Sequence, residues 1–206
     1  MSITSCLTAH MRLSGVYWGV TAMALLGREA EMDRTYILQF VMSCYNPTVG
    51  GFAGNDASLH DVHLLYTSYA LLILVVYDAL DTLTIDMTNA IGSYVASRQN
   101  KDDGSFGGDE WNEIDVKFTY CALSVLSLLH QQDRVDVPLA MTFVASCRNF
   151  DCGFGNLPGC ESHGGHIFTA LASLSLGSAL AQVRRRDVCS IDVILYEVIS
   201  IRSHRI

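Results

Sequence analysis

Charged residues are scarce in this sequence, and no run of basic residues comes before position 184. Only 17% of the 206 residues are charged, half are hydrophobic, and the formal net charge is −8. An acidic chain without a basic stripe is not expected to bind nucleic acid. The high hydrophobic content instead favours one domain with a substantial core, built from helices that are buried on more than one side.

The sequence also lacks an uninterrupted apolar run of the length that a membrane requires. Its longest apolar stretch, residues 64–80, contains Thr67, Ser68 and Asp78, whereas a membrane-spanning helix needs about 20 consecutive apolar residues. We therefore expect a buried helix there and no transmembrane segment. Residues 1–12 show no apolar signal-peptide core, so the seven irregularly spaced cysteines are expected to be reduced thiols in a cytoplasmic protein.

Alternation of period two, which is typical of β-strands, is missing as well, and a longer repeat takes its place. Three Gly-Phe corners end at Phe52, Phe106 and Phe154, with spacings of 54 and 48 residues. Glycine permits the positive φ of a tight turn, and a Phe can fill the layer between two helices. We interpret the corners as scaffold rather than as chemistry.

An amphipathic helix is predicted before each corner, and a more apolar helix after it. The segments that lead to the corners have apolar residues at i, i+3, i+4 and i+7. Asp33, Asp86 and Asp136 are predicted as the N-caps of these outer helices. Repeating this helix pair gives an all-α fold, an α,α-toroid, with inner helices around a central cavity and outer helices around them. The inner helices are predicted at 13–26, 60–79, 112–130 and 161–182.

Four segments resemble, in order along the chain, the β-subunits of protein prenyltransferases, and most closely those of Rab geranylgeranyltransferase (geranylgeranyltransferase type II). The resemblance covers about residues 11–182 and implies a partial prenyltransferase-type α/α barrel of about three and a half helix pairs. A divergent basic tail follows at 183–206, so the chain is expected to be a C-terminally truncated β-subunit. The four segments are 11–19, 61–67, 99–115 and 149–165.

The resemblance also implies a reaction and its participants. Such an enzyme transfers a geranylgeranyl group from geranylgeranyl diphosphate to C-terminal cysteines of Rab GTPases, which an escort protein presents. The β-subunit is expected to form a heterodimer with a helical α-subunit and to bind zinc, which turns the substrate thiol into a thiolate. The alternative is a catalytically silent isoform or remnant that only binds an α-subunit.

Aromatic residues on the predicted inner helices are candidates for the lining of a lipid tunnel. Tyr17, Trp18, Phe118 and Tyr120 lie on these helices. By themselves such residues are more typical of an ordinary core, and the resemblance is what favours a tunnel for Tyr17 and Trp18. It also implies that the small Ser14 leaves room for a twenty-carbon lipid.

Two basic residues are candidates for binding the diphosphate. His163 matches the histidine of a family motif and begins an inner helix, where its N–H can donate to a phosphate oxygen. A helix cap or a core position is the other reading of His163. Lys117 stands where the family usually has an arginine; it keeps the charge but loses the bidentate geometry of a guanidinium.

Two other enzyme classes are not favoured by the pattern of carboxylates. A glycosidase needs a pair of carboxylates, but the acidic residues after the second corner are more typical of a solvated turn and a helix start. A terpene cyclase, another α,α-toroid, needs an Asp-x-Asp-Asp motif, which residues 81–86 do not contain. The acidic residues after the second corner are Asp109, Glu110, Glu113 and Asp115.

The zinc site is where the sequence departs from the family that it resembles. Asp187 and Cys189 match the family's Asp-Val-Cys pair, but they follow His163 at about half the expected distance, and no histidine comes a repeat later. The pair is either the family's zinc ligands after loss of an intervening segment or a chance match. We expect weak zinc binding by this chain. A second candidate set of zinc ligands is Cys152, Cys160, His163 and His166.

Overall fold

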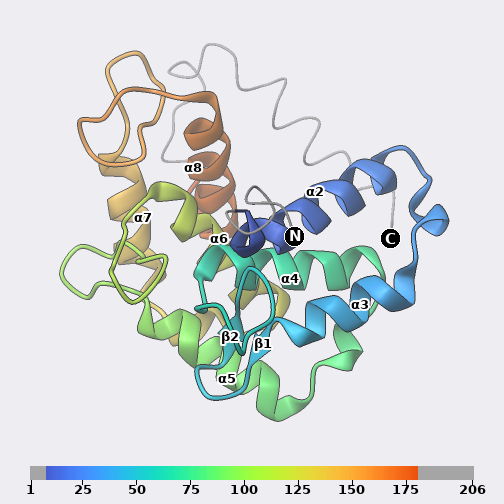
Figure 1. Ribbon diagram of the computed structural model, residues 1–206. Coiled ribbons are helices and arrows are strands. Elements are labelled where there is room, and N and C mark those ends of the chain that lie inside the picture. The colour runs from blue at the N-terminus through green and yellow to red at the C-terminus, as the bar shows by residue number, and fades with distance from the viewer. Residues whose placement is uncertain (1–7, 181–206) are drawn as a thin grey trace.

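The computed structural model describes residues 8–180, and its regular structure is dominated by helices (Figure 1). Short 3-10 turns precede the first helix and join each inner helix to the next outer one. The α-helices are α2 (Arg12–Leu25), α3 (Arg34–Ser43), α4 (Leu64–Val76), α5 (Ile85–Ser97), α6 (Val116–Leu128), α7 (Val137–Ser146) and α8 (Gly164–Leu176). The 3-10 turns are η1 (Ala9–Met11), η2 (Glu29–Glu31), η3 (Leu80–Thr82) and η4 (Gln132–Arg134).

Inner and outer helices alternate along the chain as the sequence predicts. The most extensive helix contacts join α2 to α4, α4 to α6, and α6 to α8, which makes these four the inner layer. The outer helices α5 and α7 pack against α6 and α8 from the other side (Figure 1). The predicted α,α-toroid architecture is therefore confirmed for the described residues.

The N-caps of the outer helices follow the prediction at two of three places. Asp33 accepts a hydrogen bond from the Tyr36 amide at 2.9 Å, and Asp136 accepts one from the Leu139 amide at 2.8 Å. The prediction for Asp86 was wrong, because α5 is capped by Thr84. Helix α5 has 13 residues, against 10 in α3 and α7, so it begins a turn earlier and Asp86 falls inside its first turn.

Each Gly-Phe corner is closed by one antiparallel pairing. The first corner pairs β1 (Tyr45–Asn46) with β2 (Gly51–Phe52), and Tyr45 lies opposite Phe52. Phe106 pairs with Gln99 and Phe154 with Arg148 in the same way. All three phenylalanines are fully buried, so the corners are scaffold, as predicted.

Backbone hydrogen bonds join successive corners along one rim. Residues in the first turn of α2, α4 and α6 each donate to the carbonyl of the residue two positions after the Phe of the next corner. Leu13 donates to the Gly54 carbonyl and Leu64 to the Gly108 carbonyl, both at 2.8 Å. Val116 donates to the Asn156 carbonyl at 2.9 Å. These bonds satisfy amides that a helix leaves unpaired at its N-terminus, and they place the N-termini of the inner helices side by side.

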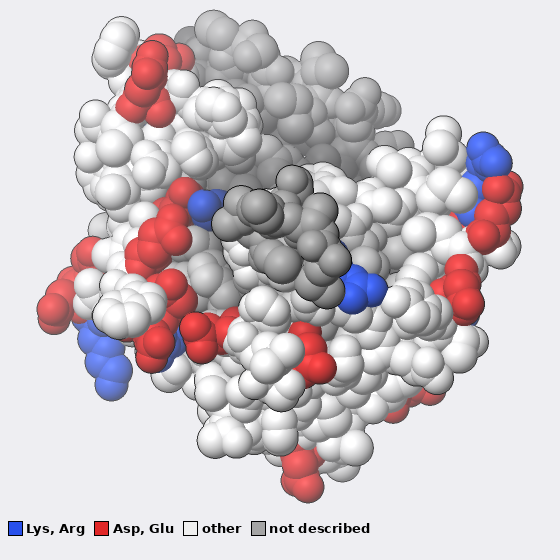
Figure 2. All heavy atoms as spheres, viewed as in Figure 1, with Lys and Arg blue, Asp and Glu red and all other residues white. Residues whose placement is uncertain are grey.

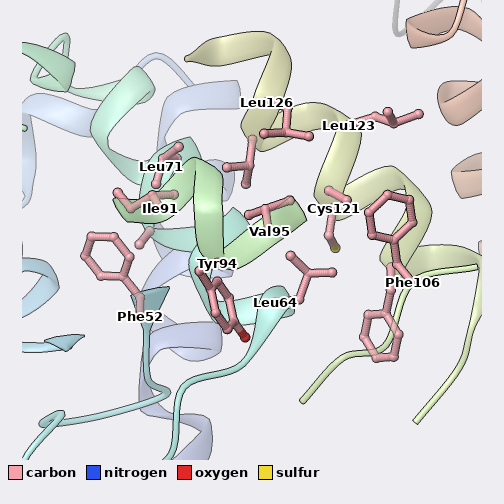
Figure 3. Packing of buried hydrophobic residues seen from close by; sticks show 14 of the residues in the cluster. Phe52, Leu64, Leu71, Ile91, Tyr94, Val95, Phe106, Cys121, Leu123 and Leu126 are labelled. Carbon is pink, nitrogen blue, oxygen red and sulfur yellow. The ribbon is translucent and has the colours of Figure 1, made fainter. Parts of the chain in front are cut away.

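The core lies between the inner and outer layers, as Figure 3 shows for α4, α5 and α6. Leu71, Ile91, Val95 and Leu126 pack there without exposed surface. The apolar stretch at 64–80 forms α4, which is largely buried in this core, and leads into the first residue of η3. Helices long and apolar enough to cross a membrane are absent from residues 8–180. The predicted boundary between residues 182 and 183 falls outside the described residues.

Candidate functional site

Aromatic side chains from the inner helices α2 and α4 form a stacked cluster. The rings of Tyr17 and Tyr69 are parallel within 8°, with centroids 4.2 Å apart. Trp18 meets both edge-on, at 5.0 and 6.2 Å, and keeps 59% of its surface exposed. Ser14 lies one turn before Trp18 on the same stripe of α2 and is half-buried.

The cluster continues onto α6 and α8. Tyr120 on α6 and Phe168 on α8 meet edge-on, with centroids 5.6 Å apart. Burial, together with the nearby Tyr120 hydroxyl, raises the pKa of Tyr17. The helices that carry the two groups of rings pack side by side in the order α2, α4, α6 and α8. All four inner helices therefore contribute to one aromatic wall, made of Tyr17, Trp18, Tyr69, Tyr120 and Phe168.

Phe118 does not belong to this aromatic wall, although the sequence placed it with Tyr120. Its side chain is only 1% exposed, and its ring meets the His63 ring edge-on at 5.3 Å. Tyr69 and Phe168 were not predicted. Phe168 lies 48 residues after Tyr120, which is also the spacing of the second and third corners, so the repeat itself contains the signal.

The N-caps of the inner helices α4, α6 and α8 are His63, Asp115 and His163. Each has an extended backbone, and its side chain accepts a hydrogen bond from the amide two residues later. The distances are 3.0 Å for His63, 2.8 Å for Asp115 and 3.1 Å for His163. The cap predicted as one reading of His163, and the helix start predicted at Asp115, are both found.

Capping leaves the second ring nitrogen of His163 available. Because Nδ1 accepts the bond from the Gly165 amide, a neutral ring carries its proton on Nε2. His163 is exposed and stands at the N-terminus of α8, where an anion is favoured. A cap and a phosphate donor are thus compatible roles for this one side chain.

A cluster of charged and titratable side chains surrounds Asp115. The buried Asp115 carboxylate lies 3.2 Å from Lys117 Nζ and 3.8 Å from His166 Nε2. The His166 ring is 5.2 Å from the His163 ring. Lys117 and His163, predicted separately, therefore belong to one patch, which we call the rim cluster: Asp115, Lys117, His163 and His166.

The rim cluster adjoins the aromatic wall. Lys117 precedes Tyr120 by three residues on α6, and His163 caps the helix that carries Phe168. Residues three apart on a helix share a face. The arrangement places a polar, partly cationic patch at the end of an apolar, aromatic surface, which suits a ligand with an anionic head and an apolar tail.

The candidate zinc ligands are not brought together in the described part of the chain. Residues 8–180 contain no group of three or more His, Cys, Asp or Glu side chains that could hold a metal ion. The set of Cys152, Cys160, His163 and His166 is therefore not a zinc site; His163 Nδ1 caps α8, and His166 Nε2 faces Asp115. The predicted ligands Asp187 and Cys189 lie outside the described residues.

Comparison with known proteins agrees with the fold and the sequence motifs. Residues 2–193 match the family described as prenyltransferase alpha-alpha toroid domain. The chain is 42% identical to the geranylgeranyl transferase type-2 subunit beta of Saccharomyces cerevisiae over 174 residues, covering 84% of this chain and 53% of that protein. The Candida albicans protein of the same name is 34% identical over 181 residues, covering 84% and 52%.

A solved structure supports the fold independently. Candida albicans protein geranylgeranyltransferase-I, complexed with GGPP, superimposes with a TM-score of 0.76 at 20% identity, covering 89% of this chain and 57% of that one. The chain spans about half the length of the curated relatives that it matches. Its alternating helices, its joined corners and the match over residues 2–193 show that it belongs to the prenyltransferase alpha-alpha toroid family.

Proposed function

We propose that this chain is part of the β-subunit of a Rab-type geranylgeranyltransferase. The enzyme would transfer a geranylgeranyl group from geranylgeranyl diphosphate to C-terminal cysteines of Rab GTPases presented by an escort protein. The observation that carries the proposal is the aromatic wall that adjoins the rim cluster, together with the similarity to type-2 β-subunits.

The aromatic wall supplies the site for the isoprenoid tail. Tyr17, Tyr69 and Tyr120 present ring surfaces from three adjacent inner helices. Covering the exposed Trp18 with an apolar tail removes apolar surface from water on both partners, at about 25 cal/mol per Å². Ser14 adds little volume on the same stripe, which leaves space for a long tail.

The rim cluster supplies the site for the diphosphate. Lys117 Nζ and the His163 Nε2–H are donors for phosphate oxygens, and Asp115 positions Lys117. His166 Nδ1 is buried without a hydrogen-bond partner among the described residues, so the cluster has an unfilled polar position. As the sulfur–carbon bond to the substrate cysteine forms and the carbon–oxygen bond breaks, charge grows on the leaving diphosphate, and these donors stabilise it.

The substrate thiol has to become a thiolate, and the described residues do not provide a metal for that step. We assign no part of thiol activation to them. The heterodimer with an α-subunit, the Rab substrate with its escort protein, and a cytoplasmic location complete the proposal. Of these, the α-subunit partner is supported by the names of the similar proteins, which are β-subunits.

The preference for one lipid length over another, measured in variants of Ser14, tests the proposal. The chain is purified with a prenyltransferase α-subunit, and competition between geranylgeranyl and farnesyl diphosphate is measured by radioligand binding. We expect preference for the twenty-carbon lipid, which Ser14→Trp reverses because the indole fills the space beside Trp18. Ser14→Ala is the matched control and keeps the preference. An unchanged preference in Ser14→Trp contradicts the proposed tunnel.

A further inference from the structure

A second cavity lies apart from the aromatic wall and the rim cluster. It has a volume of about 760 Å³ and is lined by His10, the turn at 47–50, residues 61–66 at the start of α4, part of α5, and the loop at 109–111. We call it the corner groove. It shares no lining residue with the wall or the cluster, and its volume is in the range of about 300–1,000 Å³ that ligand sites have.

Tyr94 marks the floor of the corner groove. Its side chain lines the groove but is only 7% exposed, and its hydroxyl has no hydrogen-bond partner within residues 8–180. A buried hydroxyl without a partner is costly in a folded protein. Burial raises the pKa of Tyr94, so the hydroxyl keeps its proton and can donate to a ligand that enters.

The mouth of the corner groove is acidic. Asp61, Asp109 and Glu110 line it, and none of the three takes part in an ion pair in the described part of the chain. Arg98 is the one Lys or Arg side chain in the described lining. Its Nη1 already donates to the Asp109 carbonyl at 2.7 Å, and its guanidinium lies 5.7 Å from the centre of the Tyr94 ring.

The wider surface has the same charge character. On the face shown in Figure 2, acidic side chains are more widespread than basic ones. A ligand of the corner groove is therefore expected to carry positive charge, because like charges at the mouth would repel an anion.

Two exposed apolar side chains flank the groove. Trp111 is 82% exposed and Val49 is 48% exposed, and both belong to its lining. Tryptophan is enriched among the residues that contribute most to binding at protein interfaces. An indole beside three carboxylates that form no ion pair within residues 8–180 suits a peptide with both apolar and basic side chains, rather than a purely ionic ligand.

We propose that the corner groove binds an extended segment of a partner protein that carries Lys or Arg next to apolar side chains. The apolar side chains pack on Trp111 and Val49, and the basic ones pair with Asp61 and Glu110. A backbone carbonyl accepts the Tyr94 hydroxyl. This inference does not depend on prenyl transfer, because no residue of the wall or the rim cluster takes part.

The two tryptophans, Trp18 and Trp111, allow a direct test. In the full 206-residue chain with Trp18→Phe, Trp111 is the remaining indole, so its emission reports on the groove. The probe is an eight-residue peptide of alternating Lys and Val. We expect a saturable change in emission that is absent with the matching Glu-Val peptide and that weakens in 0.5 M salt, as charge pairing predicts.

Variants distinguish binding of the peptide in the corner groove from nonspecific attraction to an acidic protein. We expect Asp61→Asn with Glu110→Gln to weaken the peptide's affinity by about tenfold, and Tyr94→Phe by about three- to tenfold. Tyr94→Phe should leave the unfolding midpoint unchanged or raise it, because it removes only an unpaired hydroxyl. The charge-matched control, Asp102→Asn with Glu161→Gln, lies outside the groove lining and should bind as the parent does. Equal affinity in all variants, or no change in Trp111 emission up to millimolar peptide, overturns the proposal.

Discussion

At the scale of single residues, His63 and His163 have the same structural role in different surroundings. Both cap an inner helix through Nδ1, with φ of −140° in each case. The His63 ring is enclosed by Tyr66 and Phe118, and burial lowers the pKa of His63, which favours the neutral ring at pH 7. His163 is exposed beside His166 and opens onto the rim cluster.

This pair gives a matched test of the diphosphate site. Asn is a good N-cap, so His163→Asn and His63→Asn should both keep the start of their helix. We expect His163→Asn to weaken binding of geranylgeranyl diphosphate by about ten- to a hundredfold, because a hydrogen bond to a charged group is worth about 1.5–3 kcal/mol. His63→Asn should not change this affinity, although it loses ring packing and some stability. Equal losses of affinity, measured by titration calorimetry, would assign His163 a structural role alone.

The sequence predicts most of this site, and helix register explains what it misses. Tyr17, Trp18 and Tyr120 lie on inner helices as predicted, and Lys117 and His163 share one patch. Binding of lipid and diphosphate by these residues stays a prediction. Phe118 is buried because two residues at i and i+2 on a helix point to different faces, so it cannot accompany Tyr120. The link through Asp115 and His166 joins two repeats, and no spacing within one segment reveals it.

At the scale of elements, the corners determine how the helices stack. Gly50 and Gly104 have positive φ, of 84° and 78°. A Cβ on Gly50 would lie 2.7 Å from the Ala90 carbonyl oxygen, and one on Gly104 would meet the Leu139 backbone. The first two corners thus pack against the outer helix that follows each of them, which requires glycine for contact as well as for conformation. The periodicity of apolar residues predicts the helices. It does not predict these contacts between repeats.

A comparison of Gly159 with Gly104 tests the need for a positive φ apart from the need for close contact. Gly159 also has a positive φ, of 80°, but nothing lies within 4 Å of its Cβ position. We expect Gly159→Ala to lower the free energy of unfolding by about 1–2 kcal/mol, the cost of a left-handed conformation. Gly104→Ala should lower it by a further 1–3 kcal/mol or so, because the methyl group overpacks against α7. Chemical denaturation measures both, and equal losses would mean that the second corner does not pack closely on α7.

At the scale of the whole molecule, the inner helices form one continuous layer, and α2 at the end of this layer stays partly exposed. Trp18 and Leu25 on α2 are 59% and 71% exposed, and both are on an inner helix. The chain spans about half of its curated relatives. For zinc, the sequence predicts weak binding, with Asp187 and Cys189 as ligands, and this stays a prediction because both lie outside the described residues.

The proposed function depends most on whether the aromatic wall and the rim cluster bind an isoprenoid diphosphate together. With Trp111→Phe, Trp18 is the remaining indole and reports on the wall. Geranylgeranyl diphosphate is titrated into this variant, purified with a prenyltransferase α-subunit, and Trp18 emission is followed. If the wall and the cluster bind the lipid together, Trp18 emission shows a saturable blue shift that inorganic diphosphate alone does not produce. Unchanged Trp18 emission from a folded complex at saturating lipid would contradict the proposed function.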